Sequence, residues 1–228
     1  MRISMVVALT AASMATSLVA DERADVAKRL DAANTVLNEI MGTPDKGIPQ
    51  DLLDKAQCVV VVPSVKRLGL VFGGKYGRGF TTCRKAGAGW GAPEGVKVEG
   101  GSVGFQIGGS ETDVVLLVMN KSGAEKLLQS KFTLGAGAEV AAGPVGRDAS
   151  AETDAMMRAE ILSYSRSRGV FAGITLSGAT LRPDKEANIA LYGGNPSAEK
   201  ILMGGTPVPA EAMTLNATLD KYSMHKDN

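Results

Sequence analysis

The chain has 228 residues, of which 44% are hydrophobic and 21% are charged, and its formal net charge is +1. This length is sufficient for a single domain with a sizeable hydrophobic core. The near-neutral charge excludes a global electrostatic attraction to nucleic acid or to an anionic membrane, and the 4% aromatic content disfavours binding by base stacking.

The first twenty residues have the pattern of a signal peptide. Arg2 supplies a positive charge, residues 3–12 are almost wholly apolar, and small residues up to Ala20 offer cleavage positions. The apolar run is shorter than the about 20 residues that span a bilayer. The abrupt change to charged residues after Ala20 disfavours a buried N-terminal helix. We therefore expect residues 1–20 to be a signal peptide and residues 21–228 to be a single exported domain, in the periplasm or cell envelope and peripheral to a membrane.

The segment from Asp21 to Met41 has the spacing of an amphipathic helix. Its apolar positions, three or four residues apart, are Val26, Leu30, Ala33, Val36, Leu37 and Ile40. The polar face mixes acidic and basic residues, whereas helices that lie on membranes have a cationic polar face. We therefore expect this helix to pack on a sheet, and a second, short helix to follow over Gln50–Ala56.

Beyond Cys58 the pattern changes to short apolar runs separated by Gly, Asn, Asp and Ser, which is typical of an antiparallel sheet. Strands are predicted over residues 58–63, 69–72, 80–84, 102–108, 113–119 and 134–142. Ser122 and Glu125 have the spacing of a capping box, which predicts a short helix after Ser122. Further helices are predicted over residues 152–158, 183–192 and 209–222.

These elements predict an α+β fold. Its centre is a curved, mainly antiparallel sheet with helices at the N- and C-terminal ends. The many glycines within the strands favour strong bending, up to a barrel-like partial closure of the sheet.

Cys58 and Cys83 both lie on predicted strands. In an exported protein they could form a disulfide. Two buried thiols are the alternative, and the sequence does not decide between them, because it does not give the distance between the two backbones.

A cationic patch is the most specific candidate site. Residues 69–75 have the glycine and lysine spacing of a phosphate-binding loop, but Tyr76 stands where a magnesium-binding Ser or Thr is needed, so we reject a nucleotide site. A glycine-rich turn that carries Lys75 and Arg78 is the preferred interpretation. If the strands pair in chain order, these residues would lie near Lys66, Arg67 and Arg84 at one end of the sheet. Such a patch could hold phosphate or carboxylate head groups; the alternative is charges scattered around the loops.

Catalytic residues are few. His225 is the single histidine and lies in the polar C-terminal tail, so no Ser or Cys has a plausible general base. Two cysteines and one distant histidine do not form a zinc site. Glu111 and Asp113 are expected to lie at a turn before the next strand. We therefore expect no enzymatic activity and no cofactor.

The most informative segment is Ser163–Gly178, which reads SYSRSRGVFAGITLSG and predicts two strands joined by a tight turn at Gly169. Together with the segments 47–49, 56–63, 89–93, 101–108, 112–115, 134–136 and 142–147, it resembles the SYLF family. The resemblance extends over nearly the whole of residues 21–228. It implies lipid binding, with phosphoinositides as the ligands of eukaryotic members and actin as a partner of some. We do not expect phosphoinositide or actin binding for an exported bacterial protein.

The sequence therefore predicts a non-enzymatic envelope protein that contacts anionic phospholipid or a membrane surface through a basic patch. The predicted head-group residues are Lys66, Arg67, Lys75, Arg78 and Arg84, followed by Arg147, Arg166 and Arg168. The alternative function is a structural or stress-related envelope protein that binds a protein partner through an apolar surface.

Overall fold

The computed structural model describes residues 3–43, 45, 47–69, 72–85, 89–103, 110–146, 158–167, 170–173, 176 and 178–223. The helices are α1 (Ile3–Met41), α2 (Gln50–Lys55), α3 (Lys121–Leu127), α5 (Lys185–Tyr192), α6 (Ala198–Leu202), the 3-10 helix η1 (Ala210–Ala212) and α7 (Met213–Tyr222). The strands are β1 (Cys58–Gly69), β2 (Phe72–Cys83), β3 (Glu94–Val103), β4 (Ser110–Val118), β5 (Phe132–Thr133), β6 (Val140–Ala142), β7 (Ile161–Ser167), β8 (Val170–Gly173) and β9 (Thr180–Pro183).

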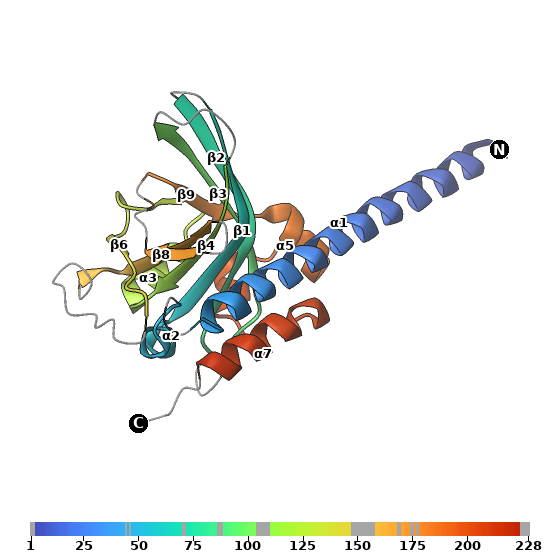
Figure 1. The fold of residues 1–228 in the computed structure, drawn as a ribbon. Coiled ribbons are helices and arrows are strands. Elements are labelled where there is room, and N and C mark those ends of the chain that lie inside the picture. The colour runs from blue at the N-terminus through green and yellow to red at the C-terminus, as the bar shows by residue number, and fades with distance from the viewer. Residues whose placement is uncertain are drawn as a thin grey trace.

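The strands form one nine-stranded sheet in the order β5-β9-β3-β2-β1-β4-β7-β6, with β8 paired to β7. Of the described strand pairs, β6 with β7 is parallel and the others are antiparallel. The sheet is curled, and β1, β2 and β3 rise beyond the rest of the body (Figure 1). The predicted α+β fold, with a curved, mainly antiparallel sheet and helices at both ends, is confirmed.

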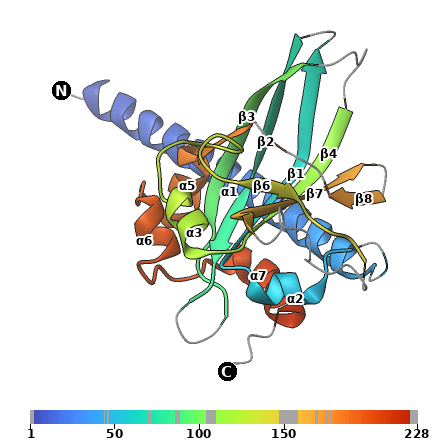
Figure 2. The ribbon, with the colours of Figure 1, turned by 90° about the vertical axis from the view of Figure 1, so that its left-hand side faces the viewer.

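Helix α1 packs across one face of this sheet, as its spacing predicted. All six of its predicted apolar positions are buried in one core cluster, together with the sheet residues Val59, Val61 and Val115. Helices α5 and α7 lie against the same helix (Figure 1). The first part of α1, which the sequence analysis assigns to the leader, projects away from the body (Figure 2). We call this side of the sheet the α1 face.

The opposite side, the α3 face, carries a second core cluster. Alternate residues of the same strands, such as Val60, Val62 and Leu116, pack there with α3, α6 and the segment around Phe132. A sheet buried on both faces explains the continuous apolar run of Cys58–Val62, because neither side of that strand meets water. Within the part of the chain that the structure describes, no helix is long and apolar enough to cross a membrane.

The predicted glycine-rich turn over residues 73–79 is wrong, because these residues belong to β2. Gly69 pairs with Gly73, so β1 and β2 form a long hairpin; residues 70–71, which connect the two strands in the sequence, lie outside the described residues. Glycines serve here for close approach of the backbones. A Cβ at Gly79 would lie 2.1 Å from the carbonyl oxygen of Val61, next to the point where the β1 register shifts.

Other local predictions are also corrected. Asn120 caps α3 by accepting from the amide of Gly123, whereas the hydroxyl of Ser122 donates to Glu160, so the predicted capping box does not form. Asp113 lies within β4 and not at a turn. The predicted strand over residues 134–142 is reduced to β6, and the predicted helix over residues 152–158 lies outside the described residues except at its end. Strands β5 and β9, helix α6 and residues 94–101 of β3 were not predicted. The predicted strand over residues 69–72 is wrong, because Gly69 ends β1 and Phe72 begins β2, and the predicted strand over residues 102–108 lies outside the described residues beyond Val103.

Cys58 and Cys83 are joined by a disulfide. They are direct partners across β1 and β2, with their Cα atoms 4.0 Å apart, and both are buried on the α3 face. The bond therefore links the base of the long hairpin, at the end opposite residues 70–71.

We expect the double variant Cys58→Ala/Cys83→Ala to lose about 3 kcal/mol of unfolding free energy, because the bond closes a loop with a sequence separation of 25. Urea unfolding of the two proteins under oxidising conditions measures this difference. Adding a reductant should lower the stability of the unmodified chain but leave the variant unchanged, and equal stabilities in all four samples would contradict the expectation.

Candidate functional site at the hairpin tip

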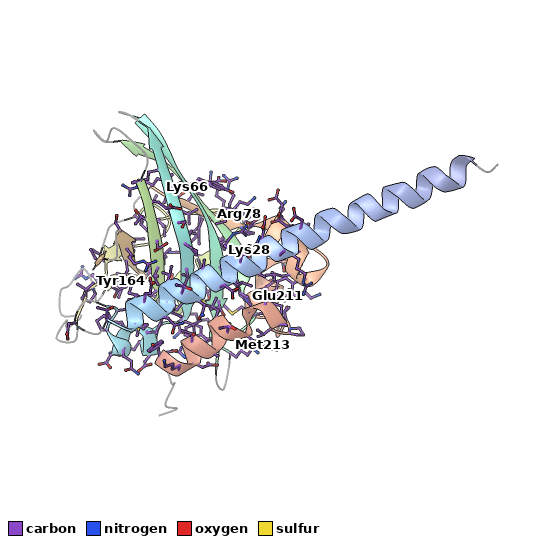
Figure 3. All side chains as sticks on the ribbon, turned by 45° about the vertical axis from the view of Figure 1, so that its right-hand side comes forward. Lys28, Lys66, Arg78, Tyr164, Glu211 and Met213 are labelled. Carbon is purple, nitrogen blue, oxygen red and sulfur yellow. A yellow bond between two sulfur atoms is a disulfide. The ribbon has the colours of Figure 1, made fainter. Side chains whose placement is uncertain are left out.

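The outer part of the β1–β2 hairpin gathers three cations and one aromatic residue. Lys66 pairs with Tyr76, and Arg67 pairs with Lys75, next to the turn between the strands. We call Lys66, Arg67, Lys75 and Tyr76 the hairpin-tip cluster. In Figure 3 the labelled Lys66 lies farther out along the hairpin than Arg78.

The four residues are divided between the two sides of the hairpin. Arg67 and Lys75 are direct cross-strand partners and so share one side, which continues the α3 face through Val65. Lys66 and Tyr76 share the other side, the one that continues the α1 face. Lys66 is exposed, and 46% of the Tyr76 surface is exposed. The tip therefore offers a cation to a partner on either side.

The pair of Arg67 and Lys75 is electrostatically unfavourable by itself. Partial burial, and then the neighbouring charge of Arg67, lower the pKa of Lys75 below its usual value. Among the described residues, neither cation has an ion pair or a side-chain hydrogen bond. Like charges directly opposite each other destabilise a strand pair, and an anion between them would remove the repulsion.

Arg78, two residues nearer the base of the hairpin, is engaged within the protein. Its guanidinium contacts Asp184 at 2.5 Å, Glu22 at 2.9 Å and Glu186 at 3.3 Å. Burial opposes its charge, but these carboxylates hold the pKa of Arg78 above its usual value. Asp184 is fully buried and also lies 3.3 Å from Lys97, so this network joins α1, the sheet and the start of α5.

Arg84 lies at the opposite end of the hairpin from the tip. It donates to the main-chain oxygens of Leu53, Asp54 and Ala56 at the end of α2, and its guanidinium lies 4.4 Å from the centre of the Trp90 ring. A further bond of 3.4 Å reaches the carbonyl of Ser223 after α7. Arg84 therefore connects the end of α2 and the residue after α7 to the sheet.

The remaining predicted head-group residues do not join the tip. Arg166 on β7 contacts Asp113 at 2.6 Å and also pairs with Glu39 of α1. Arg147 and Arg168 lie outside the described residues. Of the eight predicted residues, the structure thus brings together Lys66, Arg67 and Lys75. The sequence analysis did not include Tyr76 in the site; its place immediately after Lys75 was the available signal.

Among the described residues, no group of three or more His, Cys, Asp or Glu side chains could hold a metal ion.

Comparison with known proteins identifies the family. A sequence profile described as "Las17-binding protein actin regulator", of the Ysc84 family, matches residues 99–222, more than half of the chain. The chain belongs to the SYLF (Ysc84) family. It is 33% identical over 186 residues to the human SH3 domain-containing YSC84-like protein 1, which covers 81% of this chain and 54% of that protein. It is 32% identical over 177 residues to LAS seventeen-binding protein 3 of Saccharomyces cerevisiae, which covers 76% of this chain and 38% of that protein.

Protein YSC84 of Saccharomyces cerevisiae is 30% identical over 200 residues, covering 84% of this chain and 42% of that protein. The SYLF chain therefore spans about half or less of the length of these relatives.

The signature segment of the SYLF chain has a structural role. The predicted hairpin is confirmed, since β7 pairs with β8 and Ser165 lies opposite Ala172. Tyr164 is fully buried on the α1 face, and a Cβ at Gly143 would lie 2.1 Å from its ring, so only glycine fits there. Ser163 donates to the carbonyl of Ala141 at 3.2 Å. These residues hold the sheet edge together and do not contribute to the hairpin-tip cluster.

Proposed function

We propose that this SYLF chain is a non-enzymatic protein that binds anionic phospholipid at a membrane surface through the hairpin-tip cluster. The observation that carries the proposal is the pair of Arg67 and Lys75, two cations directly opposite each other without a carboxylate partner among the described residues. A phosphate group can accept hydrogen bonds from both and neutralise their repulsion. Glu111 is the cross-strand partner of Lys66, and Glu99 is that of Tyr76. These two carboxylates therefore share the side of Lys66 and Tyr76, and the side of Arg67 and Lys75 has no acidic cross-strand partner.

Tyr76 suits the same role. An exposed aromatic ring with a polar end is typical of residues at the boundary between lipid and water. The hairpin extends beyond the helices (Figure 1), so its tip can reach a surface without steric hindrance from the helices. Each Lys or Arg near an anionic surface contributes about 1 kcal/mol, so Arg67 and Lys75, which have no acidic cross-strand partner, together give a moderate, salt-dependent affinity.

We further propose that the protein acts after export, in the periplasm or cell envelope. The signal-peptide pattern of residues 1–20 supports this location, and so does the Cys58–Cys83 bond, because disulfides persist in oxidising compartments. The family description names actin regulation. We do not propose actin as a partner, because a protein exported to the periplasm or cell envelope would not meet it.

A protein partner bound through an apolar surface is the second candidate function, and it has less support. The large apolar residues that are exposed in the described part of the chain lie on separate segments. They are Tyr76, Val145, Ile189, Met203 and Met213. Exposed apolar residues that occur singly are common on soluble proteins, whereas a binding face needs a contiguous patch.

The test compares the unmodified chain with the double variant Arg67→Gln/Lys75→Gln in vesicle co-sedimentation. We expect the variant to bind phosphatidylglycerol vesicles about 30-fold more weakly, which corresponds to two lost contributions of about 1 kcal/mol. Binding of the unmodified chain should also decrease at high salt and be absent with neutral vesicles.

Lys121→Gln/Lys131→Gln is the matched control, since it removes two exposed lysines outside the hairpin. If both double variants lose vesicle binding equally, the loss is a general effect of net charge and the hairpin-tip cluster is not a specific site. Salt-resistant binding to neutral vesicles would contradict the electrostatic mechanism, and no pelleting of any protein would favour the protein-partner function.

A further inference from the structure

A second candidate site lies away from the hairpin-tip cluster. It is formed by α1, α5, α6 and the segment that leads to η1. It is a cleft of about 860 Å³, within the range of 300–1,000 Å³ that is usual for small-molecule sites. Its lining comes from five parts of the chain: α1, the end of α5, residues 194–196, α6 and residues 204–209. In Figures 1 and 2, α5 lies next to the part of α1 from which the N-terminal end projects.

One part of the cleft is apolar and held in position. Leu191, Tyr192 and Val208 belong to, or pack against, the core cluster of the α1 face. The hydroxyl of Tyr192 donates to the carbonyl of Pro93 at 2.5 Å, which fixes the ring. These side chains are therefore already in position before an apolar group of a ligand binds against them.

The loops around the cleft leave its space open. Gly193 and Gly205 have φ values of 68° and 69°, which L side chains rarely adopt. A Cβ built at either of them, or at Gly194, would meet no other heavy atom within 4 Å. These glycines therefore allow the loops to turn tightly, and they place no side chain in front of the apolar wall.

The charges that line the cleft are all positive. Arg23 and Lys200 are present, and none of the lining residues is Asp or Glu. Arg23 is held by a bond of 2.6 Å to Glu211 and one of 3.2 Å to the carbonyl of Ala190, so its charge is largely balanced. Lys200 has no side-chain partner among the described residues. Lys200 is exposed and lines the same cleft as the apolar wall, and a long, flexible lysine without a partner can reach the anionic end of an amphiphile that is bound there.

We propose that this cleft binds a small organic anion, a carboxylate or phosphate attached to an apolar group, with Lys200 contacting the anionic end and the wall of Leu191, Tyr192 and Val208 contacting the apolar end. The proposal is independent of vesicle binding by the hairpin-tip cluster, which involves different residues. A free amphiphile and a lipid within a membrane share this chemistry, and the test distinguishes them.

The experiment titrates the full chain, labelled with ¹⁵N, with octanoate and with octyl phosphate in the absence of vesicles. We expect saturable shifts of the amide signals of Gly193, Gly194, Gly204 and Gly205, because these glycines line or border the cleft. Acetate, inorganic phosphate and octanol should each bind more weakly than the corresponding alkyl anion. The variant Lys200→Gln should weaken octanoate binding about tenfold, the loss expected for one charge-assisted contact.

Lys185→Gln is the matched control, because it removes an exposed lysine of α5 that does not line the cleft. Equal binding of octanol and octanoate, or unchanged binding by Lys200→Gln, would overturn the role of the anion. Equal binding of inorganic and octyl phosphate would overturn the role of the apolar wall. Shifts at the four glycines with phosphatidylglycerol vesicles but not with the free amphiphiles would overturn the cleft as a small-molecule site.

Discussion

Replacing Glu94 by Gln should stabilise the protein at alkaline pH and leave its stability almost unchanged in acid. Glu94 is 2% exposed, at the start of β3 on the α3 face, and its Oε1 atom has no hydrogen-bond partner. Its cross-strand partner Thr81 is also buried, and the Oγ1 atom of Thr81 is unpaired as well. A small cavity of about 10 Å³, close to the volume that holds one water molecule, is lined by Glu94 and Thr81 together with Phe132 and Leu181.

The sign of the effect follows from the direction of the pKa shift. Burial raises the pKa of Glu94 from 4.5 to about 8 in the folded protein. Between these two pH values the unfolded chain releases the proton while the folded chain retains it, so the unfolding free energy decreases as the pH rises. Below the lower value Glu94 is protonated in both states and causes no loss, and above the higher value the loss is complete.

The expected size of the loss is about 5 kcal/mol at most, since one pKa unit corresponds to about 1.36 kcal/mol. Gln cannot ionise, so Glu94→Gln should be more stable than the unmodified chain by an amount that grows between about pH 5 and pH 8. Urea unfolding at a series of pH values measures the difference. Two titratable or charged groups lie close to Glu94. Burial, and then the charge of Glu94, raise the pKa of Tyr192, and Arg182 lines the same cavity but pairs with Glu99 at 2.8 Å.

The control for this experiment is Glu125→Gln, which changes an exposed glutamate of α3. Its stability should follow that of the unmodified chain at every pH. A stability difference for Glu94→Gln that stays constant from acid to alkaline pH would mean that the carboxyl of Glu94 does not change its ionisation in this range, and the argument from burial would then be wrong.

The contrast between Glu94 and α1 explains which parts of the structure the sequence could predict. The apolar spacing of α1 is a local pattern, and so is the sequence that predicts the β7–β8 hairpin. The burial of α1 and the pairing of the two strands were confirmed, while the predicted turn residue Gly169 lies outside the described residues. The burial of Glu94 depends on residues far away in the sequence, including Leu127, Phe132 and Leu181, that cover it on the α3 face. No local pattern indicates that a single glutamate beside a strand will be enclosed in this way.

The same distinction applies to the candidate site. Pairing of the strands in chain order brought Lys66, Arg67 and Lys75 together, as the sequence analysis expected. The fate of Arg78 was not predictable, because its partner Asp184 lies 106 residues away in the sequence. Glycines misled the interpretation of residues 73–79, since a high glycine content is typical of turns and equally of strands whose backbones approach closely.

Replacing Arg84 by Lys is expected to reduce stability by about 4 kcal/mol, the second large effect. Arg84 donates to three carbonyl groups at the end of α2. The carbonyl of Leu53 also accepts from the amide of Ala56 at 3.3 Å, whereas those of Asp54 and Ala56 belong to the last turn, whose carbonyls lack partners within the helix. Its planar guanidinium can make these bonds at once and also stack on Trp90, whereas the single ammonium of Lys cannot. Each bond from a charged donor contributes about 1.5–3 kcal/mol, and carbonyls that lose their partner cost more than the bond itself.

Thermal and urea unfolding measure this loss, with Lys85→Gln as the control, because Lys85 is the exposed neighbour of Arg84. The result also separates the two roles that have been considered for Arg84. A structural role predicts a large loss of stability, with vesicle binding unchanged at temperatures where the variant is folded. A head-group role predicts little loss of stability, since an exposed contact contributes little to folding, and weaker vesicle binding, since Lys cannot replace the bidentate contact of Arg to a phosphate. Arg84 lies at the base of the hairpin with Trp90 and Ser223 beside it, whereas a membrane at the hairpin tip would lie at the opposite end of β1 and β2. We therefore expect the structural outcome, a large loss of stability with unchanged vesicle binding.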